Sequence, residues 1–267
     1  MERYQVIIAY DGTHFQGFQR QGSSRTVQAE VEAALRALGW QGETILYAGR
    51  TDSGVHAFGQ VIAFDLEWMH HETELLHALN ASLPEDVAAK SARIAGADFH
   101  PRYHAAARQY LYRVYCQAGR DPLRDRYAWR VWQPVQAGLL HQAAACLAGT
   151  HDFAAFGSPL RPGGSTIRTV FRAIWQPVEE DEWIFRISAN AFLYRMVRRL
   201  VFLQVLVGQK KLSVDQFSAA LQIPQPLIPG LAKPNGLFLE RVYYTDDGLE
   251  PEGFIETLSA SGEEDCG

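Results

Sequence analysis

The sequence has few cysteines, and their spacing disfavours two classes of protein. It contains three among 267 residues, Cys116, Cys146 and Cys266, and no two of them lie at the spacing of a metal-ligand pair. A disulfide framework and a zinc site are therefore both disfavoured. We expect reduced thiols, no metal and no other cofactor.

Long hydrophobic runs are also missing. The N-terminus begins with an alternating pattern where a secretory signal would have a basic region followed by an apolar stretch. The longest apolar segment, residues 192–207, is interrupted by Arg195, Arg198 and Arg199 and is unsuited to crossing a bilayer. We therefore expect a cytoplasmic protein with no membrane role.

Lysine is scarce, since arginine supplies 21 of the 25 basic residues. The net charge of −5 disfavours a nucleic-acid partner, but residues 87–214 carry 18 Lys and Arg against 8 Asp and Glu, whereas residues 240–267 carry 1 against 9. A basic body with an acidic tail is typical of proteins that bind polyanions, and the planar guanidinium suits phosphates and stacked bases. Solvated surface charge explains the pattern equally well.

Hydrophobic periodicity predicts the same order of elements twice. In the first half it predicts strands at 4–10, 44–48, 60–66 and 87–94 and helices at 27–38 and 72–81. In the second half it predicts strands at 108–117, 167–178, 183–189 and 237–244 and helices at 135–147, 192–207 and 214–221. Both halves follow the β-α-β-β-α-β order of the ferredoxin-like motif, so the predicted fold class is α+β.

This order also predicts the domains. We expect an N-terminal half at residues 1–104, a C-terminal half at 105–245 and an acidic, flexible tail at 246–267. An antiparallel sheet with both helices on one face leaves its other face open to single-stranded RNA. The same architecture hosts metal chaperones and small-molecule binders, so it selects no function by itself.

The most distinctive motif is Gly49-Arg50-Thr51-Asp52-Ser53-Gly54-Val55-His56, which lies in the loop between the two central strands of the first half. Glycines at both sides allow a tight turn and a close approach by a substrate. Taken alone, Asp52 is more often a turn-stabilising residue than a catalyst, and His56 is more often a packing residue.

Residues 48–57 (AGRTDSGVHA) resemble the catalytic motif of the tRNA pseudouridine synthase A family, whose aspartate attacks the nucleoside. Further stretches resemble the same family in the same order and extend the match over nearly the whole chain: residues 10–12, 15–21, 26–28, 99–102, 107–112, 149–156, 189–198 and 235–239. The resemblance implies a uridine-to-pseudouridine isomerase acting on the anticodon stem-loop of tRNA, at nucleotides 38, 39 and 40. It also implies a homodimer, and two halves joined in one extended antiparallel sheet with a central RNA-binding cleft.

The resemblance also implies roles for individual residues. It maps the catalytic aspartate to Asp52, the tyrosine that stacks on the base to Tyr110, the arginine that pairs with the aspartate to Arg198, and an arginine that handles the flipped nucleotide to Arg50. The chemistry suits these types, because the reaction breaks the N1–C1′ bond and re-forms it at C5 with no external atom or electron. A carboxylate can add at the sugar or abstract a sugar proton, and the residues leave both routes open.

The two residues expected to act beside Asp52, Tyr110 and Arg198, can also be explained by purely structural roles. Tyr110 lies in a tyrosine-rich strand, so it can be an ordinary sheet residue, and Arg198 can belong to a polar stripe on a helix. A guanidinium that keeps the carboxylate ionised in a water-poor cleft suits Arg198. The expected phosphate contacts are Arg102, Arg108, Arg168, Arg195 and Arg199, with Arg161 and Arg172 as further candidates.

The glycine-rich loop at residues 157–165 lacks the lysine of a P-loop, so we interpret it as a mobile insertion facing RNA. Four residues depart from the family pattern. Ser53 replaces an alanine, and Phe18 stands where tryptophan is frequent. Arg195 and Phe202 replace residues that are commonly His and Gly, which puts local RNA contacts and helix packing in doubt.

Two other functions stay open on the sequence. A non-catalytic RNA-binding module would use the same basic face, and a metal or metabolite binder would use the same scaffold. Of these two, only the RNA-binding module would bind its partner more weakly as the salt concentration rises, because counterion release drives binding to phosphates.

Overall fold

The computed structural model describes residues 1–179, 181–222 and 228–245, so the expected acidic tail lies outside the described residues. The chain divides into two compact units. The first contains Met1–Ala105 with Phe238–Val242, and the second contains the described residues from Ala106 to Leu237 and from Tyr243 onward. Among the described helices, none is both long and apolar enough to cross a membrane.

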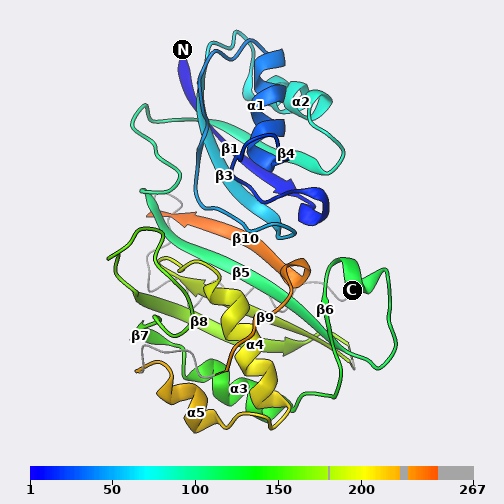
Figure 1. Cartoon of the computed structure of the whole chain (residues 1–267). Coiled ribbons are helices and arrows are strands. Elements are labelled where there is room, and N and C mark those ends of the chain that lie inside the picture. Colours follow the sequence, from blue (N-terminus) through cyan, green and yellow to red (C-terminus); the bar gives the residue numbers. More distant parts are fainter. Residues whose placement is uncertain (180, 223–227, 246–267) are drawn as a thin grey trace, which may run out of the picture. The chain divides into compact units, whose positions relative to one another are not determined.

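The first unit has the element order that the sequence predicts. Its elements are β1 (Glu2–Tyr10), a 3-10 turn (Gly12–His14), α1 (Val27–Ala37), β2 (Leu46–Tyr47), β3 (His56–Leu66), α2 (Glu72–Ser82) and β4 (Val87–Ala95). β1 lies between β3 and β4 and pairs antiparallel with both, while β2 pairs antiparallel with β3. This strand order is the ferredoxin-like order, and Figure 1 shows α1 beside α2.

Local sequence explains these elements. Along β1, alternate side chains Tyr4, Val6 and Ile8 are buried, each contributing roughly 1.5–3 kcal/mol of hydrophobic stabilisation. α1 begins after Thr26, whose hydroxyl accepts a hydrogen bond from the Ala29 amide and satisfies one free N–H of the first turn. The helix thereby presents Val31 and Leu35 to the core.

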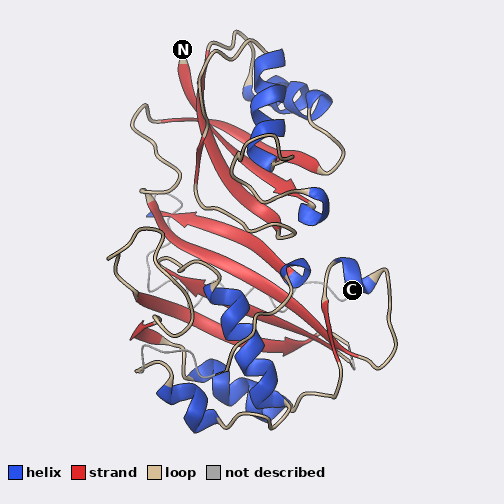
Figure 2. Cartoon of the chain, viewed as in Figure 1, coloured by secondary structure: helices blue, strands red, loops and turns tan. Residues whose placement is uncertain are grey.

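The second unit has a mostly antiparallel sheet in the order β5-β9-β8-β7, with β6 paired to β5. Its strands are β5 (Ala105–Cys116), β6 (Trp129–Val131), β7 (Gly149–Asp152), β8 (Ile167–Pro177) and β9 (Glu182–Ala189), and its helices are α3 (Ala137–Ala145), α4 (Met196–Gly208) and α5 (Val214–Ala219). Single 3-10 turns occupy Arg124–Arg126 and Pro234–Gly236. Figure 2 shows the three helices gathered together, and the predicted α+β class with mostly antiparallel strands is confirmed.

The last strand, β10 (Leu237–Tyr244), is shared between the units. Phe238 and Leu239 pair in parallel with His56 and Ala57 of β3, within the first unit. Tyr243 belongs to the second unit, where its hydroxyl donates to the Gln109 side chain at 3.1 Å. The sequence assigns the whole strand to the second half, and periodicity alone cannot reveal that its middle joins the first sheet.

Other predicted elements also differ from the observed ones, as the following examples show. β6 and β7 are too short to produce a periodic signal, so the sequence does not predict them. β3 begins at His56 and not at residue 60. α4 begins at Met196 and not at residue 192, because Arg195 adopts a left-handed conformation with φ of 64° that cannot continue a helix.

Phe202, which departs from the family pattern, packs against the backbone of Gly230. A Cβ atom on Gly230 would lie 2.1 Å from the ring of Phe202, and Gly230 has a φ of 148° that side chains rarely adopt. The Phe202 ring also stacks on Trp129 with centroids 6.4 Å apart. The bulky residue on α4 therefore requires glycine at position 230.

We predict that Gly230→Ala lowers the free energy of unfolding by about 1–3 kcal/mol, because the new methyl group overlaps the Phe202 ring. Phe202→Ala in the same background removes the overlap, so the two changes together should cost less than the sum of their separate costs. Urea unfolding of the four proteins of this double-mutant cycle measures the difference. Additive costs would show that Phe202 does not impose the glycine.

Candidate functional site

Asp52 lies in the loop that joins β2 to β3 in the first unit, as the sequence predicts for its motif. Asp52 is half-buried and Arg50 is exposed. The Gln60 amide donates to the carbonyl of Gly49 at 2.7 Å, and the Ala48 amide donates to the carbonyl of Val61 at 2.9 Å. Both bonds fasten the N-terminal end of the motif to strand β3, and the last residue of the motif, His56, begins that strand.

A second segment, residues 15–18, supports the loop through its backbone. The Phe18 amide donates to the Thr51 carbonyl at 3.1 Å, and the Gly54 amide donates to the Phe15 carbonyl at 3.3 Å. The Ser53 hydroxyl donates to the same Phe15 carbonyl at 3.2 Å. These bonds flank Asp52 on both sides, so they fix the backbone from which its carboxylate projects.

Gly17 allows this close approach. Its φ is 89°, and a Cβ atom at this position would lie 2.8 Å from the Thr51 carbonyl oxygen and 3.3 Å from the Asp52 carbonyl carbon. A side chain here would push the Asp52 loop away and strain the backbone. The close packing of the Asp52 loop therefore requires glycine at position 17.

Beneath the loop lies a buried side-chain contact that the sequence does not reveal. The hydroxyls of Tyr10 and Thr51 lie 2.8 Å apart, and both residues are buried. Tyr10 is the last residue of β1, so this bond connects the centre of the sheet to the residue that precedes Asp52. In the sequence, this bond is signalled only by a tyrosine at the end of the first predicted strand.

His56 has a packing role, as expected. It is 1% exposed, and its Nδ1 accepts a hydrogen bond from the Gly12 amide at 3.0 Å. Its ring stacks on Phe238 of β10 with centroids 4.6 Å apart. These contacts connect β3 to β10 within the first unit.

Two residues expected in the site, Tyr110 and Arg198, belong to the second unit. Tyr110 is half-buried on β5 and meets the ring of Phe192 edge-on, with centroids 4.9 Å apart. Two residues further on the same face, Tyr112 donates its hydroxyl to the Lys233 carbonyl at 2.6 Å. Burial raises the pKa of Tyr112 well above its usual value, and the nearby charge of Arg198 offsets part of the rise. Arg198 bonds to the Ala232 carbonyl, next to the Lys233 carbonyl that accepts from Tyr112, so it lies near Tyr112.

The orientation of Arg198 is fixed by its own unit. Its Nε donates to the Ala232 carbonyl at 2.8 Å, and the Ala232 amide donates to the Arg198 carbonyl at 3.2 Å.

The neighbouring Arg199 is expected from the sequence to contact phosphate, but the structure buries its side chain. It is 7% exposed, it donates to the Gly230 carbonyl at 2.7 Å, and burial lowers its pKa. Arg199 therefore holds the segment around Gly230 and does not present a charge to solvent.

The other arginines expected to contact phosphate occupy more accessible positions. Arg102 and Arg195 are exposed, and Arg195 lies over the Tyr194 ring at 4.7 Å. Arg108 is half-buried and donates to the Asn190 carbonyl at 2.9 Å. Arg168 donates to the carbonyls of Ser165 and Ile167 at 2.9 and 2.6 Å, and burial lowers its pKa.

The glycine-rich loop at 157–165 is partly anchored. Ser158 and Tyr194 exchange backbone hydrogen bonds of 2.9 and 3.4 Å, which form an isolated bridge. The bridge joins the loop to the segment just before α4. The expected mobility can therefore apply only beyond Ser158.

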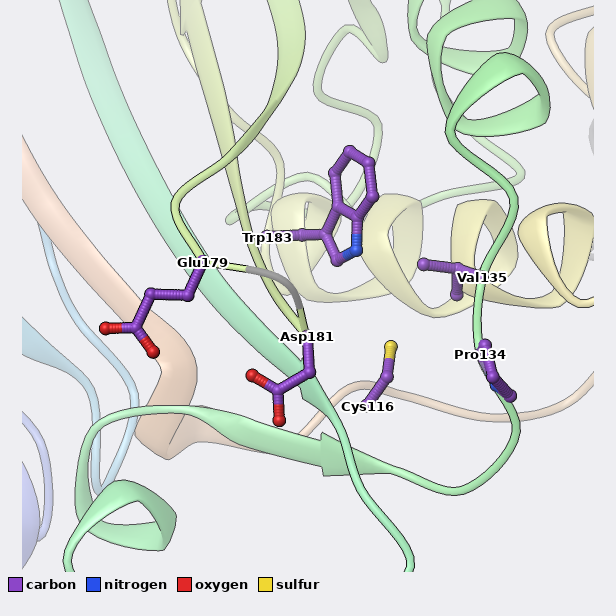
Figure 3. Close-up of a pocket in the computed structure, with 6 residues that line it drawn as sticks. All are labelled: Cys116, Pro134, Val135, Glu179, Asp181 and Trp183. Atoms are coloured by element: carbon purple, nitrogen blue, oxygen red, sulfur yellow. The ribbon is translucent and has the colours of Figure 1, made fainter.

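A pocket of about 540 Å³ in the second unit contains none of the residues expected in the site (Figure 3). Its lining is Cys116, Pro134, Val135, Glu179, Asp181 and Trp183. The Asp181 carboxylate is bound by both terminal nitrogens of Arg124, at 3.0 and 2.8 Å, and burial raises the pKa of the Cys116 thiol. The thiol is thus less nucleophilic than a free cysteine.

The structure brings the expected residues together in two groups. Arg50, Asp52 and Arg102 belong to the first unit, and Tyr110, Arg198 and the remaining arginines belong to the second. Within the described part of the chain, no group of three or more His, Cys, Asp or Glu is arranged to hold a metal ion.

Comparison with known proteins identifies the family. The sequence pattern of the family described as tRNA pseudouridine synthase matches residues 6–104 and 143–245, which include Asp52 and Arg198. The chain belongs to this family. A tRNA pseudouridine synthase A of Streptococcus equi subsp. equi is 39% identical over 92% of this chain and 100% of its own length. One of Geobacillus kaustophilus is 40% identical over 93% and 96%.

Membership decides among the functions that the sequence left open. The chain is a tRNA pseudouridine synthase, an isomerase that converts uridine to pseudouridine in tRNA, so it is neither a passive RNA-binding module nor a metabolite binder. Among solved structures, a Cbf5-Nop10-Gar1 complex aligns with 97% of this chain and 57% of that chain at 13% identity and a TM-score of 0.39. A likeness at that level adds nothing to the assignment.

We predict that Tyr10→Phe slows the synthase and lowers the free energy of unfolding by about 0.5–1.5 kcal/mol, because the Thr51 hydroxyl beside Asp52 loses its bond to Tyr10. Tyr4→Phe is the matched control, since it removes a hydroxyl from the same strand that bonds to Glu2 at 3.1 Å. Tritium release from C5-labelled tRNA measures the rate and urea unfolding the stability. Equal rates for the two variants would contradict a role for the Tyr10 bond in placing the loop.

Proposed function

We propose that this synthase modifies uridines in the anticodon stem-loop of tRNA, at positions 38, 39 and 40, and that Asp52 is its nucleophile. The observation that carries the proposal is the motif of residues 49–56 within the first family match. The loop geometry supports it, since hydrogen bonds at Thr51, Ser53 and Gly54 hold the backbone on both sides of Asp52. A fixed carboxylate is what attack on a ribose requires.

The proposed reaction conserves every atom. The N1–C1′ bond breaks, the base turns within the site, a new bond forms between C5 and C1′, and the proton on C5 is lost while N1 gains one. The Asp52 carboxylate acts at the sugar, either by adding to it or by removing a sugar proton, and in both routes its negative charge stabilises the cation-like transition state.

In this proposal the N-terminal half (residues 1–104) carries the nucleophile, and the C-terminal half (residues 105–245) supplies Tyr110 and Arg198. The half-buried ring of Tyr110 holds the flipped base by stacking, worth roughly 1–3 kcal/mol. Arg198 pairs with the carboxylate of Asp52. The bond from Arg198 Nε to the Ala232 carbonyl supports this role, because it limits the orientations of the guanidinium.

The basic surface of the synthase would position the tRNA backbone. Exposed Arg50, Arg102 and Arg195 suit phosphate contacts, and half-buried Arg108 and Arg168 are further candidates. Arg199 is not included, because its guanidinium is buried. Binding should therefore weaken steeply as the salt concentration rises.

We also propose that the synthase acts in the cytoplasm as a homodimer, as its resemblance to the tRNA pseudouridine synthase A family implies. Light scattering of the purified protein should then give twice the chain mass of 29.9 kDa. A mass equal to one chain at working concentration would exclude the dimer.

Replacement of Asp52 tests the proposed nucleophile. We predict that Asp52→Asn lowers the rate of tritium release from C5-labelled tRNA by more than about 10³-fold, since the amide can neither add to the sugar nor carry the charge. Binding of tRNA should change little, because the phosphate contacts remain. Asp215→Asn, on the exposed first turn of α5, is the matched control.

Mass mapping of pseudouridine in tRNA from cells that lack the protein tests the positions. Loss of modification at nucleotides 38, 39 and 40 supports the proposed substrate. An Asp52→Asn enzyme with near-parental activity would exclude Asp52 as the nucleophile.

A further inference from the structure

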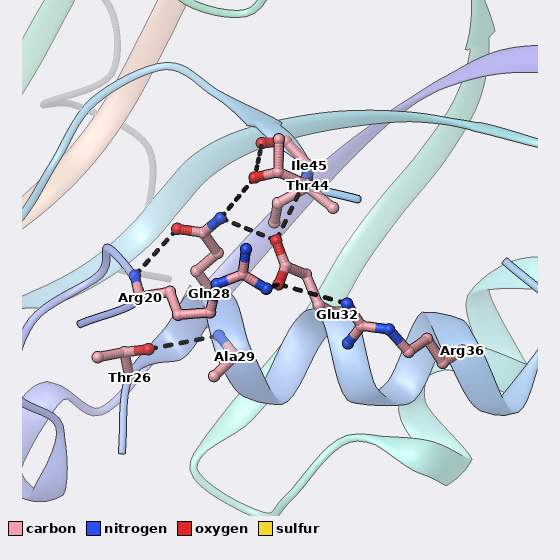
Figure 4. A network of polar contacts seen from close by, with 8 residues as sticks. All are labelled: Arg20, Thr26, Gln28, Ala29, Glu32, Arg36, Thr44 and Ile45. Carbon is pink, nitrogen blue, oxygen red and sulfur yellow. Dashed lines mark hydrogen bonds and ion pairs between the residues drawn. The ribbon is translucent and has the colours of Figure 1, made fainter. Parts of the chain in front are cut away.

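The first unit contains a buried carboxylate on α1 that belongs to a network of polar contacts (Figure 4). Glu32, on α1, has a side chain that is 0% exposed. Its oxygens accept hydrogen bonds from the side-chain amide of Gln28 at 2.8 Å, from Arg20 Nη1 at 2.7 Å and from the backbone amide of Ile45 at 3.3 Å. A fully buried charge costs free energy unless it is paired and hydrogen-bonded in this way.

Glu32 is a charged residue on the buried side of α1. Gln28 and Glu32 are four residues apart, and both are buried on the face of α1 that also carries Val31 and Leu35. An apolar side chain of similar volume would fill this place at equal or lower free energy. The polar pair Gln28 and Glu32 is therefore better explained by the neighbouring segments that it binds than by a contribution to the free energy of unfolding.

One end of the network holds the segment that supports the Asp52 loop. Arg20 bonds to Glu32 through its guanidinium, and its backbone amide donates to the Gln28 side chain at 3.0 Å. The backbone amide of Gln28 donates to the Phe18 carbonyl at 2.9 Å, so the start of α1 also holds this segment. The Phe18 amide in turn donates to the Thr51 carbonyl at 3.1 Å, next to Asp52.

The other end holds the strand that leads into the loop. The Gln28 side chain donates to the Thr44 hydroxyl at 2.8 Å, and Glu32 accepts from the Ile45 amide. β2 begins at Leu46 and runs directly to the motif. Glu32 and Gln28 therefore fix both segments that determine where the backbone of Asp52 lies.

We propose that Glu32 is a positioning residue for the isomerisation, acting through Gln28 and Arg20 on the Asp52 loop without touching the substrate. The proposal rests on the proposed role of Asp52. Shifts of about 1 Å in a reacting group, caused by changes far from the chemistry, can slow an enzyme about 100-fold. Release of the two segments should therefore slow the chemical step and leave binding of tRNA through phosphates unchanged.

The decisive measurement is the single-turnover rate of tritium release with enzyme in excess, made well below the melting temperature so that all protein is folded. For Glu32→Gln we expect a rate about 10- to 100-fold lower, with the Kd for tRNA within about twofold of the parent. Gln28→Met cuts the links to Arg20 and Thr44 and should reproduce the effect. It also decides the question should Glu32→Gln fail to fold.

Arg36→Ala is the matched control. Arg36 approaches the same Glu32 carboxylate at 3.8 Å from the next turn of α1, yet it extends the network to neither segment. Its single-turnover rate should equal that of the parent. A merely structural network would lower the melting temperature of Glu32→Gln and Gln28→Met and leave their single-turnover rates at the parental value, which would overturn the proposal.

Failure of this proposal is distinct from failure of the proposed nucleophile. Parental rates in the Glu32 and Gln28 variants together with an inactive Asp52→Asn enzyme would remove Glu32 and keep Asp52. An active Asp52→Asn enzyme would remove Asp52 as nucleophile whatever the Glu32 variants do.

Discussion

The hydrogen bond from the Phe18 amide to the Thr51 carbonyl is the contact on which the Asp52 loop depends. A carboxylate in a loop can act on a ribose only if its backbone is fixed, because misplacement by a fraction of a bond length weakens every transition-state interaction. Residues 15–18 provide that fixation through backbone groups. The absence of a side chain at Gly17 lets them approach closely enough.

Two buried charges show different solutions to one physical problem. Glu32 is surrounded by donors from a helix, a loop and the segment that precedes β2, so its desolvation is offset by hydrogen bonds that also order these parts of the chain. Arg199 donates to the carbonyl of Gly230, in a segment whose conformation suits glycine alone. In both places a polar group inside the fold determines the course of the backbone, which an apolar core cannot do with the same directional specificity.

The sequence predicts much of this organisation and misses its tertiary part. The two runs of β-α-β-β-α-β are visible because each element is long enough to show its period, and the Asp52 motif is visible because its residues are consecutive. The Tyr10–Thr51 bond and the Glu32 network join positions far apart in the chain, so no local pattern encodes them. Arg199 has the same residue type and neighbours as Arg198, and only the packing of α4 shows that one guanidinium is buried and the other is only half-buried.

The sharing of β10 between the units has a consequence for synthesis of the chain. Residues 238–242 complete the first unit, yet they are translated after residues 106–237, which form most of the second unit. Until they emerge, the part of β3 at His56 and Ala57 has no partner on that edge, and an open strand edge can pair with other chains. The N-terminal unit is thus begun first but completed only near the end of synthesis, and the nascent chain has an open strand edge in between.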